Sequence, residues 1–342
     1  MRRLIALAAA AAALAACGFK QEPTDGGTTA KEPFTVLLDY FPTADHAGIY
    51  AAQAAGLYDK AGLKVTIQAP PDPSAPLKLL QAGKADVAIS YEPELMLARD
   101  AGASDLVSVG ALVQKPLTSI IALPASKIAG VKDLAGKRIG TAGIPYQSAY
   151  LKTIEQKNAI SGVKETNVGF NLVPALVGKK VDAILGGFWN YEGVELQRMH
   201  RNPVTLRMEQ LGVPTYDELI VVGRRQDFNA AGASRLRRFL QATSAGYRLL
   251  KSDPSVGVNA LVKAGRGLDP AQESAAVQAT LPVFFPTDAS KPWGFMEPTE
   301  WALYERWMRA NGLLKRPPSP SPPLTNEFLP GESVGGSQSG SG

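Results

Sequence analysis

The sequence has few of the residues that most enzymes and metal proteins use at their reactive sites. Its 342 residues include one cysteine and two histidines. One cysteine cannot form an internal disulfide, and His46 and His200 lack the spacing of a zinc site. There is no Walker A loop, no Gly-x-Gly-x-x-Gly fingerprint, and no Gly-x-Ser-x-Gly elbow after a predicted strand. We therefore expect a protein with no catalytic residue, no metal and no cofactor.

Neither positive nor negative charge is concentrated in any one segment of the chain. The net charge is +5, with 45% hydrophobic and 20% charged residues, as in an ordinary globular protein. Lysines and arginines are scattered and are not interleaved with aromatic residues, so we expect no nucleic-acid partner. The length suits two domains, and we expect a monomer.

The N-terminus has the pattern of a bacterial lipoprotein signal. Two arginines precede an apolar run over 4–16, which is too short to span a bilayer as a folded helix. The run ends in Leu-Ala-Ala-Cys, which resembles the lipobox, where a peptidase cuts before a lipid-bearing Cys. We predict a signal peptide over 1–16, lipid attachment at Cys17 and a tether over 17–33. The alternative is an ordinary signal peptide followed by an incidental Cys.

The C-terminal end has little apolar content. Residues 317–323 are all proline or serine, and glycine and serine dominate the last residues of the chain. Such composition is typical of disorder. We predict a disordered tail over 317–342 and a folded part over about 34–316.

Between these ends, short apolar segments alternate with helical patterns, which indicates α/β units and parallel sheets. Strands are expected over 34–38, 63–67, 84–89, 118–123, 181–185 and 218–222. Helices are expected over 77–82, 231–250, 254–265, 270–279 and 299–312.

One helix–turn–strand unit occurs twice. Gly-Lys-Ala-Asp-Val-Ala-Ile begins at Gly83 and Gly-Lys-Lys-Val-Asp-Ala-Ile at Gly178, one residue apart in spacing. Chance similarity of two short units is one explanation, and two similar lobes facing one cleft is the other. We predict lobe 1 over 34–122 and 220–316 and lobe 2 over 123–219. Each lobe would have a mixed, mostly parallel sheet flanked by helices, and a two-strand hinge would join them.

Asp39 and Tyr40 directly follow the first expected strand. Ligands of open parallel sheets sit outside the carboxyl ends of the strands. An acid beside an aromatic ring suits a flat, nitrogen-rich ligand. Asp45 is expected to be the N-cap of the next helix, with His46 at its cleft-side start. The alternative is a Tyr in the core and an Asp that caps a turn.

Four segments of the chain form a recognisable set: Leu-Asp-Tyr-Phe-Pro, His-Ala-Gly-Ile-Tyr, Ala-Asp-Val-Ala-Ile-Ser-Tyr-Glu-Pro-Glu-Leu and Gly-Gly-Phe-Trp-Asn-Tyr-Glu-Gly. They resemble the thiamine-pyrimidine group of type II periplasmic binding proteins. The similarity runs over about 34–251. Members of this group are substrate-binding components of ABC importers. The resemblance implies capture of a hydroxymethyl- or formylaminomethyl-pyrimidine precursor of thiamine. Near relatives serve riboflavin-precursor import, and distant ones serve sulfonates.

By position, the resemblance implies that Tyr40 or Tyr91 stacks on one face of a pyrimidine and Trp189 on the other. Asp39 and Glu192 would accept hydrogen bonds from its N–H groups. The full set of predicted ligand-binding residues is Asp39, Tyr40, His46, Ser90, Tyr91, Glu94, Tyr146, Trp189, Glu192, Tyr216 and Glu218.

The same fold resembles the eukaryotic enzyme that makes the thiamine pyrimidine from its own histidine and pyridoxal phosphate. This chain has Ser90 in place of the enzyme's cofactor lysine and Glu94 in place of its sacrificed histidine. The enzyme's cysteine-rich iron motif falls near 212–216, which contains no cysteine. We therefore predict a binding protein and not a synthase.

The resulting expectation is a binding protein, lipid-anchored on the outer side of the cytoplasmic membrane, that delivers its ligand to an ABC permease with its ATPase. Riboflavin or a flavin precursor and a sulfonate are the alternative ligands. A ligand sensor that presents the same lobes to a membrane receptor is the alternative class. Neighbouring permease and ATPase genes would favour import.

Overall fold

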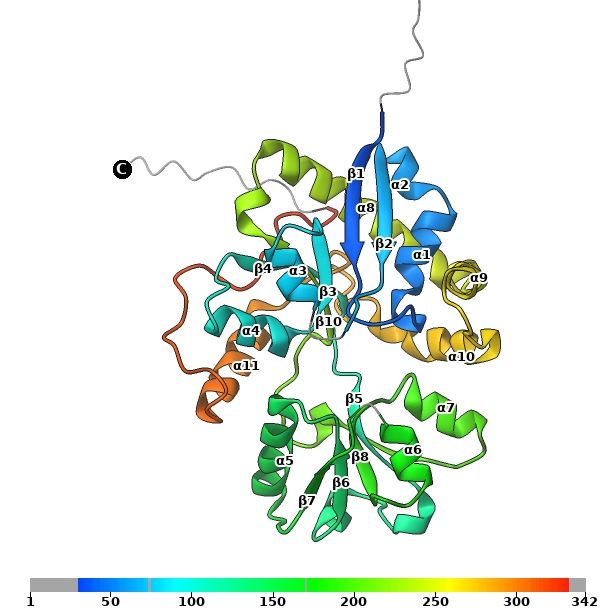
Figure 1. Cartoon of the computed structure of the whole chain (residues 1–342), viewed down its shortest axis with the longest axis vertical. Coiled ribbons are helices and arrows are strands. Elements are labelled where there is room, and N and C mark those ends of the chain that lie inside the picture. Colours follow the sequence, from blue (N-terminus) through cyan, green and yellow to red (C-terminus); the bar gives the residue numbers. More distant parts are fainter. Residues whose placement is uncertain (1–29, 73–74, 170, 332–342) are drawn as a thin grey trace, which may run out of the picture. The chain divides into compact units, whose positions relative to one another are not determined.

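The computed structural model describes residues 30–72, 75–169 and 171–331 (Figure 1). The chain divides into two units, Met1–Ala30 and Lys31–Gly342, and the second holds every element described below. Cys17, the predicted signal peptide and residues 332–342 of the predicted tail lie outside the described residues. Within the described ranges, no helix combines the length and the apolar character needed to cross a membrane.

The first sheet has five strands in the order β2-β1-β3-β10-β4. Their bounds are β1 Glu32–Leu37, β2 Leu63–Gln68, β3 Val87–Ser90, β4 Leu106–Val113 and β10 Leu219–Arg224. β1 runs parallel to β2 and β3, whereas β10 is antiparallel to both β3 and β4. β1 begins at Glu32, so the predicted tether over 17–33 extends two residues too far.

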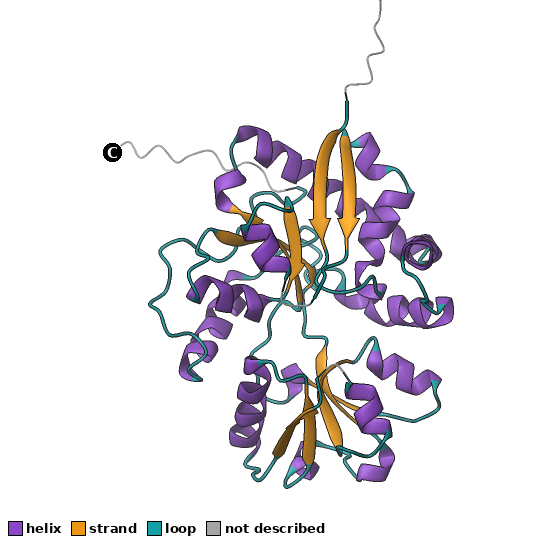
Figure 2. Cartoon of the chain, viewed as in Figure 1, coloured by secondary structure: helices purple, strands orange, loops and turns teal. Residues whose placement is uncertain are grey.

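The second sheet also has five strands, in the order β7-β6-β8-β5-β9. Figure 2 shows the strands in orange and the helices that flank them in purple. Their bounds are β5 Thr118–Ala122, β6 Arg138–Thr141, β7 Lys164–Asn167, β8 Ala183–Phe188 and β9 Val204–Arg207. β6 is parallel to β7 and β8, and β5 is antiparallel to β8 and β9. The predicted mixed α/β sheets are thus confirmed.

The predicted lobe boundary at residue 122 is wrong. β5 falls within the residues predicted for lobe 1, but its Ile121 pairs with Ile184 of β8 in the second sheet. An apolar strand buried on both faces does not reveal from its own sequence which sheet it joins. The chain passes from the first sheet to the second over 114–117 and returns over 208–218.

The helices cover both faces of the first sheet and flank the second (Figure 1). In the first half of the chain they are α1 Ala47–Ala54, α2 Leu57–Lys60, α3 Pro76–Gln81, α4 Glu92–Asp100 and α5 Pro145–Asn158. In the second half they are α6 Leu172–Val177, α7 Glu192–Arg198, α8 Ala230–Ser252, α9 Ser255–Ala264, α10 Pro270–Thr280 and α11 Pro298–Ala310.

Alternation along the strands divides the core of the first sheet. Val36 packs in a cluster with residues of α1, α8 and α9, and its neighbour Leu37 packs in another with residues of α3, α4 and α11. Val221 and Val222 of β10 divide in the same way. Successive side chains of a strand point to opposite faces, so both faces of this sheet are buried. Burial on both faces fixes the ends of the strands and thus the starting positions of the segments that follow them.

The two helix–turn–strand units align on Asp86 and Asp182. The Oδ2 atoms of these aspartates accept the backbone N–H of Thr35 at 2.7 Å and of Arg138 at 2.8 Å. When the two units are aligned on these aspartates, Gly83 corresponds to Lys179, and the one-residue offset between the two sequence patterns disappears. Both residues are left-handed, with φ of 73° and 57°. The same turn geometry therefore joins helix to strand in both sheets.

Lys179→Gly is expected to raise the free energy of unfolding by about 0.5–1 kcal/mol, because a side chain in the left-handed region is strained and glycine is not. Urea denaturation measures this change. Gly83→Ala is the matched control and should lower the free energy of unfolding by about 1 kcal/mol. Equal stability of wild type and Lys179→Gly would contradict the argument.

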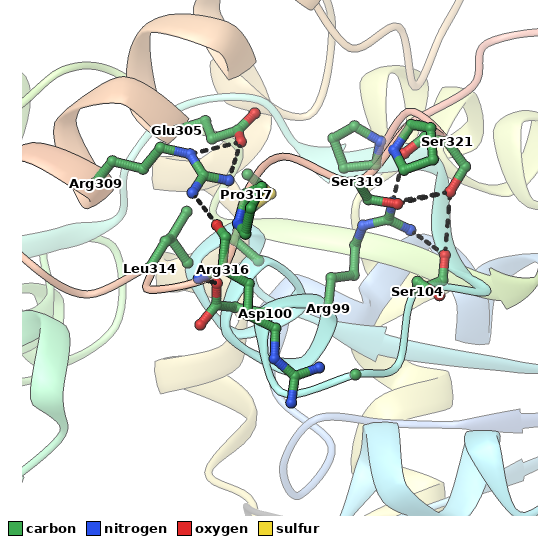
Figure 3. A pocket seen from close by; sticks show the side chains of 14 residues that line it. Arg99, Asp100, Ser104, Glu305, Arg309, Leu314, Arg316, Pro317, Ser319 and Ser321 are labelled. Carbon is green, nitrogen blue, oxygen red and sulfur yellow. Dashed lines mark hydrogen bonds and ion pairs between the residues drawn. The ribbon is translucent and has the colours of Figure 1, made fainter.

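The predicted disorder over 317–342 is wrong for residues 317–331. Leu324 forms a parallel bridge with Ser108 of β4, and Phe328 and Leu329 are buried against the core. The buried Arg99 donates to the carbonyl oxygen of Ser321 at 2.6 Å (Figure 3). Backbone carbonyls of a proline-rich segment can still accept hydrogen bonds, so low apolar content did not prevent this segment from packing.

A cavity of about 300 Å³ lies beneath this segment (Figure 3). Arg99 and Asp100 at the end of α4, Glu305 and Arg309 of α11, and three prolines of the segment, Pro317, Pro320 and Pro323, are among its lining residues. Asp100 accepts the backbone N–H of Arg316 at 2.8 Å, and Arg309 pairs with Glu305 at 2.7 Å. None of the predicted ligand-binding residues lines this cavity.

Candidate functional site

The segment after β1 carries Asp39 and Tyr40, as the sequence predicts. Asp39 is 5% exposed, whereas Tyr40 is 38% exposed and its ring meets that of Phe41 edge-on at 5.1 Å. The chain then forms a 3-10 turn, η1, over Ala44–His46 and continues into α1. Thr43 is the N-cap of that turn, so the predicted capping role of Asp45 is wrong. Asp45 instead lies inside the turn and is buried.

Two donors converge on the carboxylate of Asp39. His46 Nε2 lies 2.7 Å from Oδ1, and the Tyr91 hydroxyl donates to Oδ2 at 2.5 Å. Burial alone raises the pKa of Asp39, but the electrostatic attraction of the His46 N–H and the hydrogen bonds from His46 and Tyr91 outweigh it, and the net pKa is lowered. Asp39 is therefore an anion held in one orientation.

The N-terminus of α4 brings Ser90, Tyr91 and Glu94 to the same place. Ser90 ends β3, and its hydroxyl donates to Glu94 Oε2 at 3.2 Å. The net pKa of Glu94 is raised to about 7: burial raises it most, the Ser90 hydrogen bond lowers it, and the charges of Asp39 and Glu218 raise it. Asp39 and Glu218 therefore each lie close enough to Glu94 to affect its charge.

Tyr146 comes from α5 beside the second sheet and is also buried. Its ring meets Tyr150 edge-on, with 5.6 Å between centroids. Burial, followed by the charges of Glu94 and Glu218, raises the pKa of the Tyr146 hydroxyl well above its usual value. Its hydroxyl therefore stays protonated and can donate.

Trp189 and Glu192 follow β8 of the second sheet. The indole Nε1 donates to the carbonyl of Pro116 at 3.0 Å, and the guanidinium of Arg207 lies 4.0 Å from the ring centroid. Glu192 accepts the backbone N–H of Phe188 at 2.7 Å, and burial raises its pKa to about 7. Arg207 covers one face of Trp189, so at most one face can stack on a ligand.

Glu218 and Tyr216 lie on the returning crossing and serve its packing. The carboxylate of Glu218 accepts four hydrogen bonds, from the backbone N–H groups of Leu117 and Thr118 at 2.7 and 2.9 Å and from the hydroxyls of Thr118 and Tyr216, both at 3.1 Å. Tyr216 is buried against the rings of Tyr150 and Tyr304. Glu218 thus links the two crossings to each other.

Sequence reasoning missed a second group of contacts between the two sheets. Asn190 after β8 donates to Asp45 Oδ1 at 2.6 Å and to the hydroxyl of Thr280 at 2.8 Å. Tyr191 donates to Glu273 Oε1 at 2.8 Å. Asn190 and Tyr191 lie between Trp189 and Glu192 in the sequence, but their hydrogen bonds can be identified only from partners that are distant in the chain.

Asp45 should make stability depend on pH. Burial raises its pKa from 3.8 to about 7. The folded state then binds more protons than the unfolded state between pH 4 and 7, so the contribution of Asp45 is fully present below about pH 4 and is lost as the pH rises through 7. In Asp45→Asn, which still accepts from Asn190, the fall in unfolding free energy between pH 5 and 8 should be about 1–2 kcal/mol smaller. Urea titrations at both pH values measure it, and identical pH profiles would contradict it.

The arrangement is therefore a set of buried and half-buried carboxylates interleaved with aromatic rings, drawn from both sheets and from the crossing between them. Asp39, Ser90, Tyr91, Glu94, Tyr146 and Glu218 are linked to one another by hydrogen bonds or by charge. Glu192 is linked to the group through Asp45. Within the described residues, no cluster of side chains has the composition of a metal site. Such a surface suits a ligand that offers N–H donors and a flat ring.

The fold is that of the periplasmic binding proteins. The alkanesulfonate-binding protein SsuA from Xanthomonas axonopodis, solved with bound MOPS, superposes with a TM-score of 0.63 at 21% identity. The match covers 83% of this chain and 96% of that protein. SsuA from Escherichia coli gives the same TM-score at 17% identity, with 83% and 94% covered. These likenesses establish the architecture.

The chain belongs to the NMT1/THI5-like family, whose model matches residues 43–256. A putative thiamine biosynthesis protein from Haemophilus influenzae is 35% identical over 68% of this chain and 74% of its own length. The formylaminopyrimidine-binding protein of Halalkalibacterium halodurans is 29% identical over 92% of this chain and 95% of its own. A relative from Legionella pneumophila, 26% identical over 88% and 93%, is named 4-amino-5-hydroxymethyl-2-methylpyrimidine phosphate synthase. The resemblance described from the sequence is thereby confirmed.

Proposed function

We propose that this protein is the substrate-binding component of an ABC importer and that it captures an unphosphorylated pyrimidine precursor of thiamine. The observation that carries the proposal is the match to a formylaminopyrimidine-binding protein over 92% of this chain. Formylaminomethyl- and hydroxymethyl-pyrimidines share an aminopyrimidine ring with several N–H donors. The proposed ligand contacts are Trp189 and Tyr91 or Tyr40, which stack on the ring, and Asp39 and Glu192, which accept hydrogen bonds from it.

The charge of the site supports this ligand over a sulfonate. Asp39 is buried and Glu94 and Glu192 are half-buried, and Asp39 is held as an anion. A sulfonate or a phosphate would bring another negative charge next to these carboxylates, where repulsion is less screened than in water. An aminopyrimidine instead offers donors to each carboxylate, and a charge-assisted hydrogen bond stabilises by about 1.5–3 kcal/mol.

A binder is favoured over the pyrimidine phosphate synthase by the residues at the synthase positions. Ser90 replaces the cofactor lysine, and its hydroxyl is hydrogen-bonded to Glu94, which replaces the sacrificed histidine. The only cysteine of the sequence is Cys17, far from the position of the iron motif. A synthase that consumes its own histidine has no equivalent histidine to spend here.

The protein would deliver its ligand to a transporter in the membrane. A lipid on Cys17 would hold the protein at the outer face of the cytoplasmic membrane, where it acts as a monomer. A ligand that touches both sheets stabilises only the closed arrangement. A permease with its ATPase would recognise that arrangement and import the ligand.

Thermal unfolding of the purified protein with a ligand panel tests the proposal. The panel contains hydroxymethylpyrimidine, its formylaminomethyl analogue, thiamine, riboflavin and taurine. A ligand at 100 times its Kd stabilises by about 2.7 kcal/mol, which gives a clear rise in Tm. A rise with the two pyrimidines is expected. A rise with riboflavin alone would assign the protein to flavin import, and a rise with taurine alone would assign it to sulfonates.

A further inference from the structure

His46 belongs to a chain of hydrogen bonds in which the direction of each donor is defined. The backbone N–H of Thr43 points at His46 Nδ1, with 3.2 Å between the nitrogens. A backbone N–H can only donate, so Nδ1 must accept and cannot carry a proton. The ring proton then sits on Nε2, which faces Asp39 Oδ1 at 2.7 Å. Both ring nitrogens are thus engaged within the protein, and the side chain is 1% exposed.

The opposite side of Asp39 is fixed as well. The Tyr91 hydroxyl donates to Oδ2 at 2.5 Å, so each carboxylate oxygen receives one side-chain donor. The backbone N–H of Asp39 itself also acts on the carboxylate. A carboxylate has about four acceptor positions, so acceptor capacity remains. With both oxygens held, Asp39 cannot rotate, and its remaining acceptor directions are set before any ligand arrives.

The charges around His46 favour a ring protonated on both nitrogens, whereas the hydrogen-bond geometry favours a neutral ring. Burial lowers the pKa of His46, whereas Asp39, Asp45 and Glu273 raise it, with a net rise. A second ring proton would have to sit on Nδ1, where the Thr43 N–H already points. The hydroxyl of Thr43, 3.3 Å from Nδ1, can act as a second donor to it. We take the ring as neutral because a proton on Nδ1 would face another N–H.

We propose that His46 is a positioning residue that does not touch the ligand: it holds Asp39 as an oriented anion whose remaining lone pairs accept an amino or ring N–H group. The inference rests on the proposed function, because it assigns Asp39 to the ligand's donor edge. It replaces the sequence prediction that His46 itself contacts the ligand.

The test is a cycle of variants and ligands, measured by calorimetry on the full-length protein. The two ligands are hydroxymethylpyrimidine and its analogue with hydrogen in place of the amino group. Wild type is expected to prefer the amino compound by about 10- to 100-fold. His46→Ala should reduce this preference by about 5- to 10-fold, because Asp39 loses one of its two fixed donors. His46→Gln, whose amide can replace the Nε2 donor, should retain most of it.

His200 provides the matched control, because it is the second of two histidines and is exposed. His200→Asn should leave the preference unchanged, and it assigns the His46 signals in a nitrogen-15 NMR spectrum. That spectrum should show one neutral ring protonated at Nε2. An unchanged preference in both His46 variants, or a His46 ring protonated on both nitrogens, would overturn the positioning role.

Failure of the proposed function would look different. In that case wild type binds neither pyrimidine, while the NMR spectrum still reports the state of His46. The cycle is then run with riboflavin and its N3-methyl derivative, which lacks the ring N–H. Loss of the preference for riboflavin in His46→Ala would support the positioning role on that ligand, and an unchanged preference would overturn it.

Discussion

Replacing Glu218 by alanine is expected to lower the free energy of unfolding by about 3–5 kcal/mol. The change leaves the backbone N–H groups of Leu117 and Thr118 buried and without their acceptor. Each buried donor left unsatisfied costs about 1–3 kcal/mol. The hydroxyls of Thr118 and Tyr216 also lose an acceptor, and a cavity forms between the two crossings. Urea denaturation of the purified variant measures the loss.

Glu218→Gln is the control. Its amide oxygen can accept the two backbone N–H groups, and its amide nitrogen can donate to the Thr118 hydroxyl. We expect a loss of less than about 1.5 kcal/mol for this variant. If alanine proved as mild as glutamine, Glu218 would not be what joins the crossings.

Replacing Trp189 by alanine is expected to weaken pyrimidine binding by about 10- to 100-fold. Stacking of a base on an aromatic side chain contributes roughly 1–3 kcal/mol. The indole is held in one orientation by its bond to Pro116 and by Arg207 against its other face, so little side-chain entropy is lost when a ligand stacks on it. Titration calorimetry with hydroxymethylpyrimidine measures the change.

Trp189→Phe separates stacking from the link to Pro116. Phenylalanine keeps a ring and loses the Nε1 donor, and we expect a loss of about 2- to 5-fold. If alanine bound the pyrimidine as tightly as wild type, Trp189 would not form part of the ligand site. If both variants were equally impaired, the bond to Pro116 would matter more than the ring.

The sequence predicted the elements of the fold because burial leaves a periodic pattern. Apolar runs such as Val36 to Leu38 identified strands buried on both faces, and the repeated helix–turn–strand units indicated two sheets. The segments after β1, β3 and β8 were recognised as candidate site segments because ligands sit at the carboxyl ends of parallel strands. All of these inferences rest on residues that are neighbours in the sequence.

What the sequence could not reveal depends on partners that are distant in the chain. The sequence around β5 does not indicate that β5 pairs with β8. The sequence of 317–331 does not indicate that Arg99 and Ser108 contact this segment. The sequence places His46 at the start of a helix beside the predicted cleft, but it does not indicate that Thr43 and Asp39 contact its two ring nitrogens.

The hydrogen bond between Leu117 and Glu218, which are 101 residues apart, illustrates the same difference between local and distant information. By itself the sequence determined which residues are buried and which local structures they form, because those properties follow from periodicity and turn chemistry. Only the tertiary structure decided which polar group faces which, because a hydrogen bond is short and directional and its partner can lie anywhere in the chain.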